Sequence, residues 1–365
     1  MKVFQCSCGN ALFFGNTVCL RCQNTIGFCQ SCQHLTAFLP VSEGLFQCGN
    51  QACGVIQQKC HNDAVEHICN SGVPSPDGTV HEGALCDDCR LTEVIPNLSI
   101  DGNRQLWGRL ENAKRRVLYT LRLLNLPIGL PENTLEPKLV FDFAADEETP
   151  VFTGHDQGRI TINLREADHV EREKARVAFQ EPQRTLVGHV RHELGHYYWD
   201  LLVLGQDEEA FRAVFGDERS PTYQEALEHY YENGPRPNWV GQFVSAYSTM
   251  HPWEDFAECF GTYLDLVSVV ETANHHTGAE IRNRPISDLL AEYLELGGKA
   301  NELNREMGLG DLVPEVFSPA VATKLDYVHQ LLGRATNQTQ ANCHQTPAAP
   351  PGGSPAPAEV IGADS

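Results

Sequence analysis

Two histidines and a glutamate near the middle of the chain have the spacing of a zinc hydrolase motif. His192, Glu193 and His196 form the pattern His-Glu-x-x-His. Positions four apart share a face of an α-helix, so the two histidines can offer imidazole nitrogens to one metal ion. Glu193 then lies beside the ion, where its carboxylate can accept a proton from bound water, whose pKa zinc lowers to roughly 7. The motif predicts a catalytic zinc ion and a hydrolytic reaction.

The zinc ion needs a third, anionic ligand, because two neutral imidazoles leave its charge uncompensated. No helix breaker follows His196, so the helix is expected to continue through Asp200, which then lies one turn too far along to share the ion. A later segment carries Glu254 and Glu258, which share a helical face. We expect Glu254 to bind zinc and Glu258 to hydrogen-bond a ligand histidine from behind. The reverse assignment stays open.

The cysteines provide a second set of metal ligands, since twelve of the fourteen lie before residue 90. In an intracellular protein, closely spaced cysteine pairs indicate metal binding and not disulfides. Four thiolates can surround one zinc ion as a tetrahedron. In chain order the twelve form three groups of four: Cys6, Cys8, Cys19 and Cys22; Cys29, Cys32, Cys48 and Cys53; Cys60, Cys69, Cys86 and Cys89. We expect one to three structural zinc ions, with interleaved pairing and iron–sulfur binding as open alternatives.

Three regions must position these residues. Residues 1–95 are rich in Cys, Gly, Asn and Gln, which predicts small β zinc ribbons. Residues 96–333 predict a mainly helical domain, in which 182–204 and 252–272 form the two helices that carry the catalytic site. Residues 334–365 are rich in Ala, Pro, Gly, Thr and Gln and predict a disordered tail. The expected fold class is therefore α+β.

The helical domain also contains two predicted strands. Residues 139–143 are mostly apolar, and residues 158–164 alternate between polar and apolar side chains. Because residues 159–164 come just before the catalytic helix, we expect them to form the sheet edge with which an extended peptide substrate pairs.

The charge of the chain argues against nucleic acid as a partner. The formal net charge is -21, and residues 1–90 hold seven acidic and four basic residues, whereas phosphates attract Lys and Arg. The sequence contains no run of about 18 apolar residues and begins without the apolar stretch of a secretory signal. We therefore expect a cytoplasmic protein that does not enter a membrane.

Two segments of the chain resemble a bacterial family of zinc-binding metallopeptidases that is named from its motif. They are residues 185–200, with His192-Glu193-Leu194-Gly195-His196 at their centre, and residues 245–258. Shorter matching stretches are 153–158, 166–168, 215–219 and 86–98. The resemblance covers nearly all of the chain except the tail. It implies a zincin-like domain of the gluzincin type that hydrolyses peptides or proteins.

A more distant similarity is to the protease domain of anthrax lethal factor. That enzyme also has His-Glu-x-x-His, followed by a tyrosine seven residues before a glutamate in a Glu-x-Phe-Ala-Glu stretch. Here these positions are Tyr247 and Glu254. The similarity implies that Glu254 binds zinc and that the phenol of Tyr247 donates to the oxyanion of the tetrahedral intermediate.

Together these features predict a zinc-dependent peptidase with Glu193 as the general base. Whether it cleaves within peptides or at their ends stays open. The alternative is a non-catalytic adaptor, in which the ribbons bind a protein partner and the His-Glu-x-x-His metal site is structural. A metal-dependent regulator acting at DNA is a further alternative that the negative charge disfavours.

Overall fold

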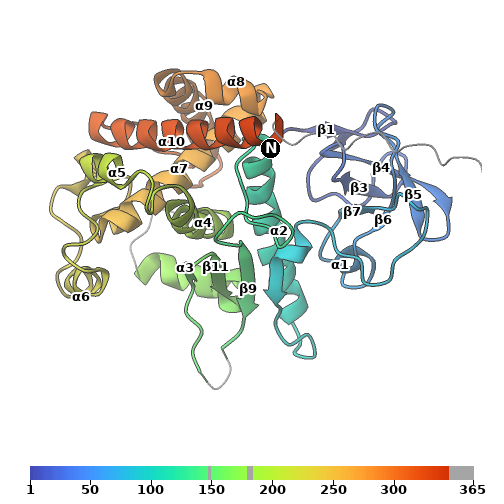
Figure 1. Ribbon diagram of the computed structural model, residues 1–365, viewed down its shortest axis with the longest axis horizontal. Helices are drawn as coiled ribbons and strands as arrows, with labels where there is room; N and C mark the ends of the chain where they lie inside the picture. Colours follow the sequence, from blue (N-terminus) through green and yellow to red (C-terminus); the bar gives the residue numbers. More distant parts are fainter. Residues whose placement is uncertain (147–148, 179–183, 345–365) are drawn as a thin grey trace, which may run out of the picture.

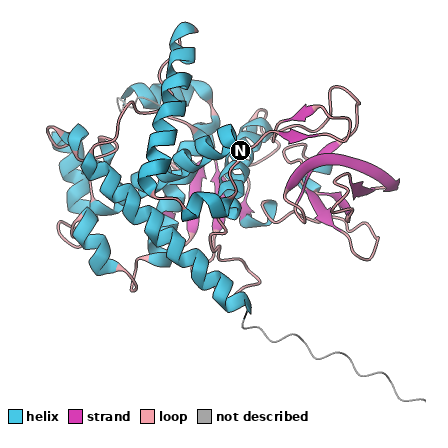
Figure 2. Ribbon diagram, turned by 90° about the horizontal axis from the view of Figure 1, so that it is seen from above, coloured by secondary structure: helices cyan, strands magenta, loops and turns pink. Residues whose placement is uncertain are grey.

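The computed structural model describes residues 1–146, 149–178 and 184–344. A β-rich region formed by the N-terminal part of the chain lies beside a mainly helical region formed by the rest (Figure 1). Viewed from above, the long β-ribbon lies at one end of the molecule and most helices gather at the other (Figure 2). The predicted α+β fold, with β zinc ribbons before a mainly helical domain, is confirmed.

The N-terminal region consists of short antiparallel strands. The first hairpin pairs β1 (Phe4–Gln5) with β2 (Ala11–Leu12). A five-stranded antiparallel sheet follows, in the order β3-β4-β5-β6-β7. Its strands are β3 (Ile26–Cys29), β4 (His34–Ser42), β5 (Leu45–Cys48), β6 (Ile56–Lys59) and β7 (Gly72–Pro74), and α1 (His61–Ala64) precedes β7.

The ribbon region has a small apolar core that is completed by the helical domain. Phe4, Phe14 and Phe28 pack edge-to-face around Tyr119, which belongs to the helix α2 (Asn103–Leu123). Such aromatic contacts bury large apolar areas. The first ribbon is therefore docked on the helical domain.

The helical domain contains a four-stranded sheet in the order β10-β11-β9-β8. Its strands are β8 (Thr92–Val94), β9 (Val140–Ala144), β10 (Gly154–Asp156) and β11 (Arg159–Asn163). The expectation that residues 159–164 form the sheet edge was wrong, because β10 pairs with the outer side of β11 and is itself the edge strand. The expected boundary at residue 95 also cuts this sheet, since β8 pairs with β9.

The helices surround one large core to which α2, α4, α7 and α10 contribute most. The α-helices after α2 are α3 (His169–Ala178), α4 (Leu186–Leu202), α5 (Glu208–Phe215), α6 (Tyr223–Asn233), α7 (Pro252–Asn274), α8 (Gly278–Asn283), α9 (Ile286–Glu306) and α10 (Pro319–His344). Short 3-10 turns are η1 (Cys89–Leu91), η2 (Leu164–Ala167), η3 (Trp239–Gly241) and η4 (Tyr247–Thr249).

The last helix corrects the predicted start of the tail. We expected disorder from residue 334, but α10 continues to His344, and Ala335 and Thr336 are buried. Residues 345–365 of the predicted tail lie outside the described residues. Among the helices that the structure describes, none is long and apolar enough to cross a membrane.

Candidate metal centre

Helix α4 carries the two histidines and is held firmly in the core. The hydroxyl of Thr185 accepts a hydrogen bond from the backbone of Gly188 and caps the start of the helix. Its Leu194, Tyr197 and Tyr198 side chains are fully buried. An apolar, capped helix of this kind fixes the direction in which His192 and His196 point.

Helix α7 brings the third candidate ligand to these histidines. Pro252 occupies the first turn, and the His251 imidazole accepts a hydrogen bond from the backbone of Trp253 and caps the helix. Glu254 lies in this first turn, where the positive end of the helix dipole stabilises a carboxylate. Its side chain is only 2% exposed.

Three side-chain atoms meet between the two helices. Nε2 of His192 lies 3.2 Å from Nε2 of His196, and Oε2 of Glu254 lies 3.0 Å from the first and 3.4 Å from the second. A tetrahedral zinc ion with bonds of about 2.0–2.1 Å holds its ligand atoms about 3.3 Å apart. The triangle therefore has the size that a zinc ion requires.

The charges at this triangle also fit a cation. His192 approaches Oε1 of Glu258 with Nδ1, at 2.7 Å. If Nδ1 carries the hydrogen of a neutral ring, the lone pair of Nε2 faces the carboxylate of Glu254. Burial alone would raise the pKa of Glu254, and positive charge on the imidazoles of His196 and His192 lowers it. An anionic Glu254 therefore needs a cation beside it, which protonated imidazoles or a bound metal ion would supply. A metal ion bound by these three residues would remove the repulsion between lone pairs.

The structure gives different positions to the two glutamates, of which the sequence favoured Glu254 as the ligand and left the reverse assignment open. Glu254 lies beside both Nε2 atoms, whereas Glu258 approaches Nδ1, the far nitrogen of His192. Asp200 is not part of the triangle. Its Oδ2 lies 3.9 Å from Nε2 of His155, and burial raises the pKa of Asp200 to about 6.

Glu193 follows His192 in α4 and is shielded from solvent. Its side chain is buried, and its Oε2 atom contacts no hydrogen-bond donor among the described residues. A buried carboxylate oxygen without a donor is costly unless a ligand or water supplies one. Burial raises the pKa of the Tyr223 phenol, and the charge of Glu254 and, less strongly, that of Glu193 add to the rise.

Aromatic side chains surround the histidines. The ring of Tyr247 lies 6.1 Å from that of His192, and Trp253 stacks on His196 at 3.6 Å between ring centres. Burial raises the pKa of Tyr247, and the charge of Glu254 adds to the rise, so its phenol keeps its hydrogen.

Tyr223 also belongs to this group, although it was not among the residues predicted from the sequence. Its hydroxyl donates to Oε1 of Glu254 at 2.8 Å. Tyr223 is the first residue of α6, and no local pattern indicates that this helix reaches α7.

The twelve N-terminal cysteines form the three groups of four that the chain order suggests. In each group the sulfur atoms lie within 4.8 Å of one another. Distances between neighbouring sulfur atoms are 3.6 Å in the first group, 3.8 and 3.9 Å in the second and 3.8 Å in the third. A disulfide would bring sulfur atoms to about 2.05 Å, whereas tetrahedral zinc with bonds of about 2.3 Å spaces them about 3.8 Å apart. The three groups fit zinc.

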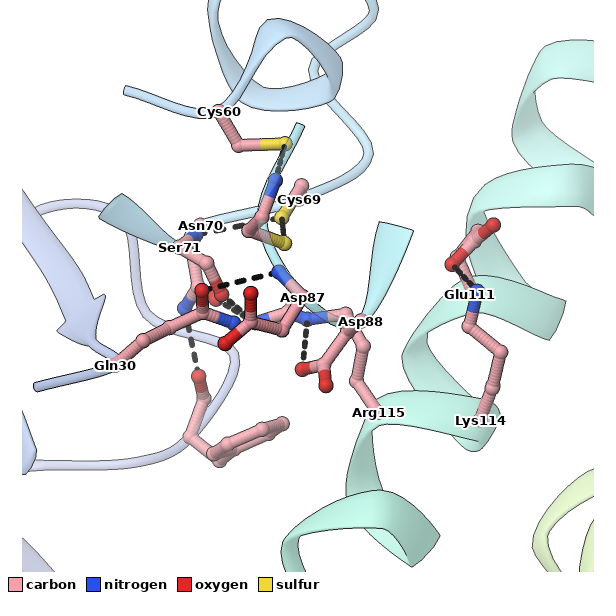
Figure 3. Close-up of polar contacts among 12 residues, drawn as sticks. Gln30, Cys60, Cys69, Asn70, Ser71, Asp87, Asp88, Glu111, Lys114 and Arg115 are labelled. Atoms are coloured by element: carbon pink, nitrogen blue, oxygen red, sulfur yellow. Dashed lines mark hydrogen bonds and ion pairs between the residues drawn. The ribbon is translucent and has the colours of Figure 1, made fainter. Parts of the chain in front are cut away.

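The third cysteine group contacts the helical domain through a buried arginine. Arg115 of α2 donates to Asn70 and Ser71, and the backbone of Ser71 donates to the sulfur of Cys69. Nε of Arg115 lies 3.8 Å from Oδ2 of Asp88. Figure 3 shows Arg115 reaching from α2 toward these residues.

The charges around Arg115 fit a metal-bound cysteine group. Asp88 is also paired with Arg122, so two buried or partly buried cations share one carboxylate. Burial would lower the pKa of Arg115, but negative charge at Cys69 and Asp88 raises it. Four thiolates around one divalent ion carry a net negative charge. This charge compensates the positive charge of the second arginine, which the single carboxylate of Asp88 leaves unbalanced.

Comparisons with known proteins match the N-terminal cysteine-rich part of the chain and its helical part to two different families. Residues 103–331 match the model of a family described as "Putative zinc-binding metallo-peptidase", and residues 3–100 match that of a zinc-ribbon domain. The chain is 34% identical over 349 residues to uncharacterized proteins of Mycobacterium bovis and Mycobacterium tuberculosis, which covers 91% of this chain and 95% of those proteins. No solved structure matches the chain.

Proposed function

Because this chain belongs to the zinc-binding metallo-peptidase family and carries a zinc-ribbon domain, we propose that it hydrolyses peptide bonds at the site formed by His192, His196 and Glu254. The observation that carries the proposal is the triangle of ligand atoms, with sides of 3.0, 3.2 and 3.4 Å. A bound zinc ion would polarise the scissile carbonyl group and lower the pKa of a water molecule.

The general base in this proposal is Glu193. Its buried Oε2 atom has no donor within the described part of the chain, so it is available to a water molecule at the triangle. Glu193 accepts a proton from that water and passes it to the leaving amine. The site then has the ligand set of a gluzincin, with two histidines and a glutamate from a later helix.

Tyr247 is proposed to donate a hydrogen bond to the oxygen that gains charge in the transition state. Its ring lies beside His192, and its phenol keeps its hydrogen because burial and the charge of Glu254 raise its pKa. A donor held in place before the reaction costs no reorganisation during it.

The substrate is proposed to bind along the edge strand β10. This strand pairs only with β11 among the described residues, so its other side can accept an extended peptide. His155 of β10 stacks on His196 at 6.2 Å between ring centres, which places the strand next to the candidate catalytic helix. A peptide added to this edge would run past the metal triangle.

The test is cleavage of a peptide library by the zinc-loaded protein and by its Glu193→Gln variant, with products identified by mass spectrometry. We expect the variant to retain zinc and to lose about 10²–10⁴-fold in activity. Equal cleavage by both proteins would assign the activity to a contaminant. Absence of cleavage by the zinc-loaded wild-type protein would support the adaptor alternative.

A further inference from the structure

We propose that Tyr223 is a positioning residue of the metal site, which reserves one carboxylate oxygen of Glu254 for the metal ion. This inference rests on the proposed metal site. The two oxygens of Glu254 have different surroundings: Oε1 accepts a hydrogen bond from the Tyr223 hydroxyl at 2.8 Å, whereas Oε2 lies beside the Nε2 atoms of the histidines. A phenol is neutral near pH 7, so it donates to the carboxylate.

The position of Tyr223 is fixed relative to the first turn of α7. Its ring packs edge-to-face on His251 at 5.5 Å and on Trp253 at 5.6 Å between ring centres. His251 caps α7, and Trp253 directly precedes Glu254 in the chain. The phenol and the carboxylate are thus held by the same short segment, which makes the hydrogen bond a fixed feature of the site.

Few side chains of α6 are buried, so apolar packing alone does not explain where this helix lies. Only Ala226 is buried among the residues of this helix, and a capping box formed by Thr222 and Glu225 starts it. Tyr223 is therefore the residue through which α6 reaches the buried carboxylate. Hydrogen-bond partners of metal ligands orient those ligands, and their loss typically costs about 10–100-fold in metal affinity or activity.

The hydrogen bond determines how Glu254 can bind a metal ion. With Oε1 engaged by Tyr223, the carboxylate offers the ion one oxygen, and a coordination position stays open for water. Without this hydrogen bond, both oxygens are free to turn toward the ion. Tyr223 therefore acts through Glu254, whereas Tyr247 is proposed to act on the substrate.

The experiment compares full-length Tyr223→Phe with Tyr231→Phe, a control on the same helix whose side chain is 64% exposed. Phenylalanine keeps the ring that packs on His251 and Trp253. Zinc affinity of the catalytic site is measured by competition with dipicolinate, which leaves the cysteine-bound metal in place. Cobalt(II) is then loaded into the emptied site, and its visible absorption spectrum reports the coordination.

We expect Tyr223→Phe to weaken zinc binding by about 10-fold or more and to change the cobalt spectrum, while Tyr231→Phe leaves both unchanged. In a Glu254→Gln background, adding Tyr223→Phe should weaken cobalt binding no further, because Tyr223 acts through Glu254. Wild-type affinity and spectrum in Tyr223→Phe, or equal losses in both tyrosine variants, would overturn the inference. Neither readout needs a substrate, so a protein that cleaves no peptide but shows the cobalt change would contradict only the proposed function.

Discussion

Gly195 of α4 lies directly against Ala257 of α7. A Cβ atom at position 195 would come within 2.6 Å of the Cα atom of Ala257 and 3.0 Å of its carbonyl oxygen. The two helices therefore touch backbone to backbone, between the histidines on one and the glutamates on the other. This close approach sets the distance across which Glu254 reaches the imidazoles.

Replacing this glycine should separate the two helices. In Gly195→Ala the new methyl group meets backbone atoms, which cannot move aside as a side chain does, so we expect a loss of about 1–3 kcal/mol of stability and weaker zinc binding. Gly298→Ala in α9 is the control, because a Cβ there meets nothing within 4 Å. It should leave zinc binding unchanged and raise stability by about 0.5–1 kcal/mol. Urea unfolding measures the stability of each variant, and zinc titration measures its zinc affinity. Equal behaviour of the two variants would contradict a close backbone contact at Gly195.

Loss of the hydrogen bond behind His192 should weaken the metal site without emptying it. In Glu258→Gln the partner of Nδ1 is neutral, so the imidazole becomes a poorer ligand, and we expect zinc affinity to fall by about 10–100-fold. Glu232→Gln, an exposed position on α6, is the matched control and should bind zinc as the wild type does. Competition with a chelator measures the zinc affinity of both variants. If Glu258→Gln binds zinc as tightly as the control, Glu258 has no such role.

Removal of the Tyr247 hydroxyl should slow turnover and spare the metal. Tyr247→Phe loses a donor to the transition state, for which we expect a fall of about 10²–10³-fold in kcat. KM should stay near its wild-type value and zinc affinity should fall far less than kcat, because within the described part of the chain Tyr223, and not Tyr247, donates the hydrogen bond to the Glu254 carboxylate. Steady-state kinetics on a cleaved library peptide decide this. A change in zinc affinity as large as that in kcat would place Tyr247 among the groups that support the metal.

The four groups of ligands found in the described part of the chain predict four bound zinc ions, one at the histidine triangle and one at each cysteine group. Elemental analysis of purified protein should give this ratio. The double variant His192→Ala and His196→Ala should lose one ion and keep the cysteine-bound ions. A further loss of zinc in this variant, or iron in place of zinc, would contradict the assignment.

The buried Arg115 should stabilise both the third cysteine group and the helical domain. Arg115→Met removes a buried cation whose charge the thiolates and Asp88 share, and we expect a loss of about 3–5 kcal/mol of stability together with faster release of zinc from this group. Arg116→Met, at the exposed neighbouring position, is the control and should have little effect. Urea unfolding and zinc release to a chromogenic chelator provide the comparison. Equal effects of the two substitutions would show that the charge of Arg115 is not coupled to the cysteines.

Local chemistry in the sequence determined much of this protein. The spacing of His192 and His196 follows from the helical repeat, which places residues four apart on one face whatever surrounds them. Pro252 correctly marked the start of α7. The chain order of the cysteines was enough to group them, because each group closes within a short stretch of the chain.

Only the tertiary structure decided how distant segments meet. Glu254 and Glu258 share a helical face, so the sequence favoured Glu254 as the ligand but left the reverse assignment open. The packing of α7 on α4 at Gly195 gives the two carboxylates different positions. The same holds for the position of β10 at the sheet edge and for the hydrogen bond from Tyr223. Helical and strand periodicity depend on neighbours in the chain, whereas these contacts depend on how whole elements pack, which no local pattern records.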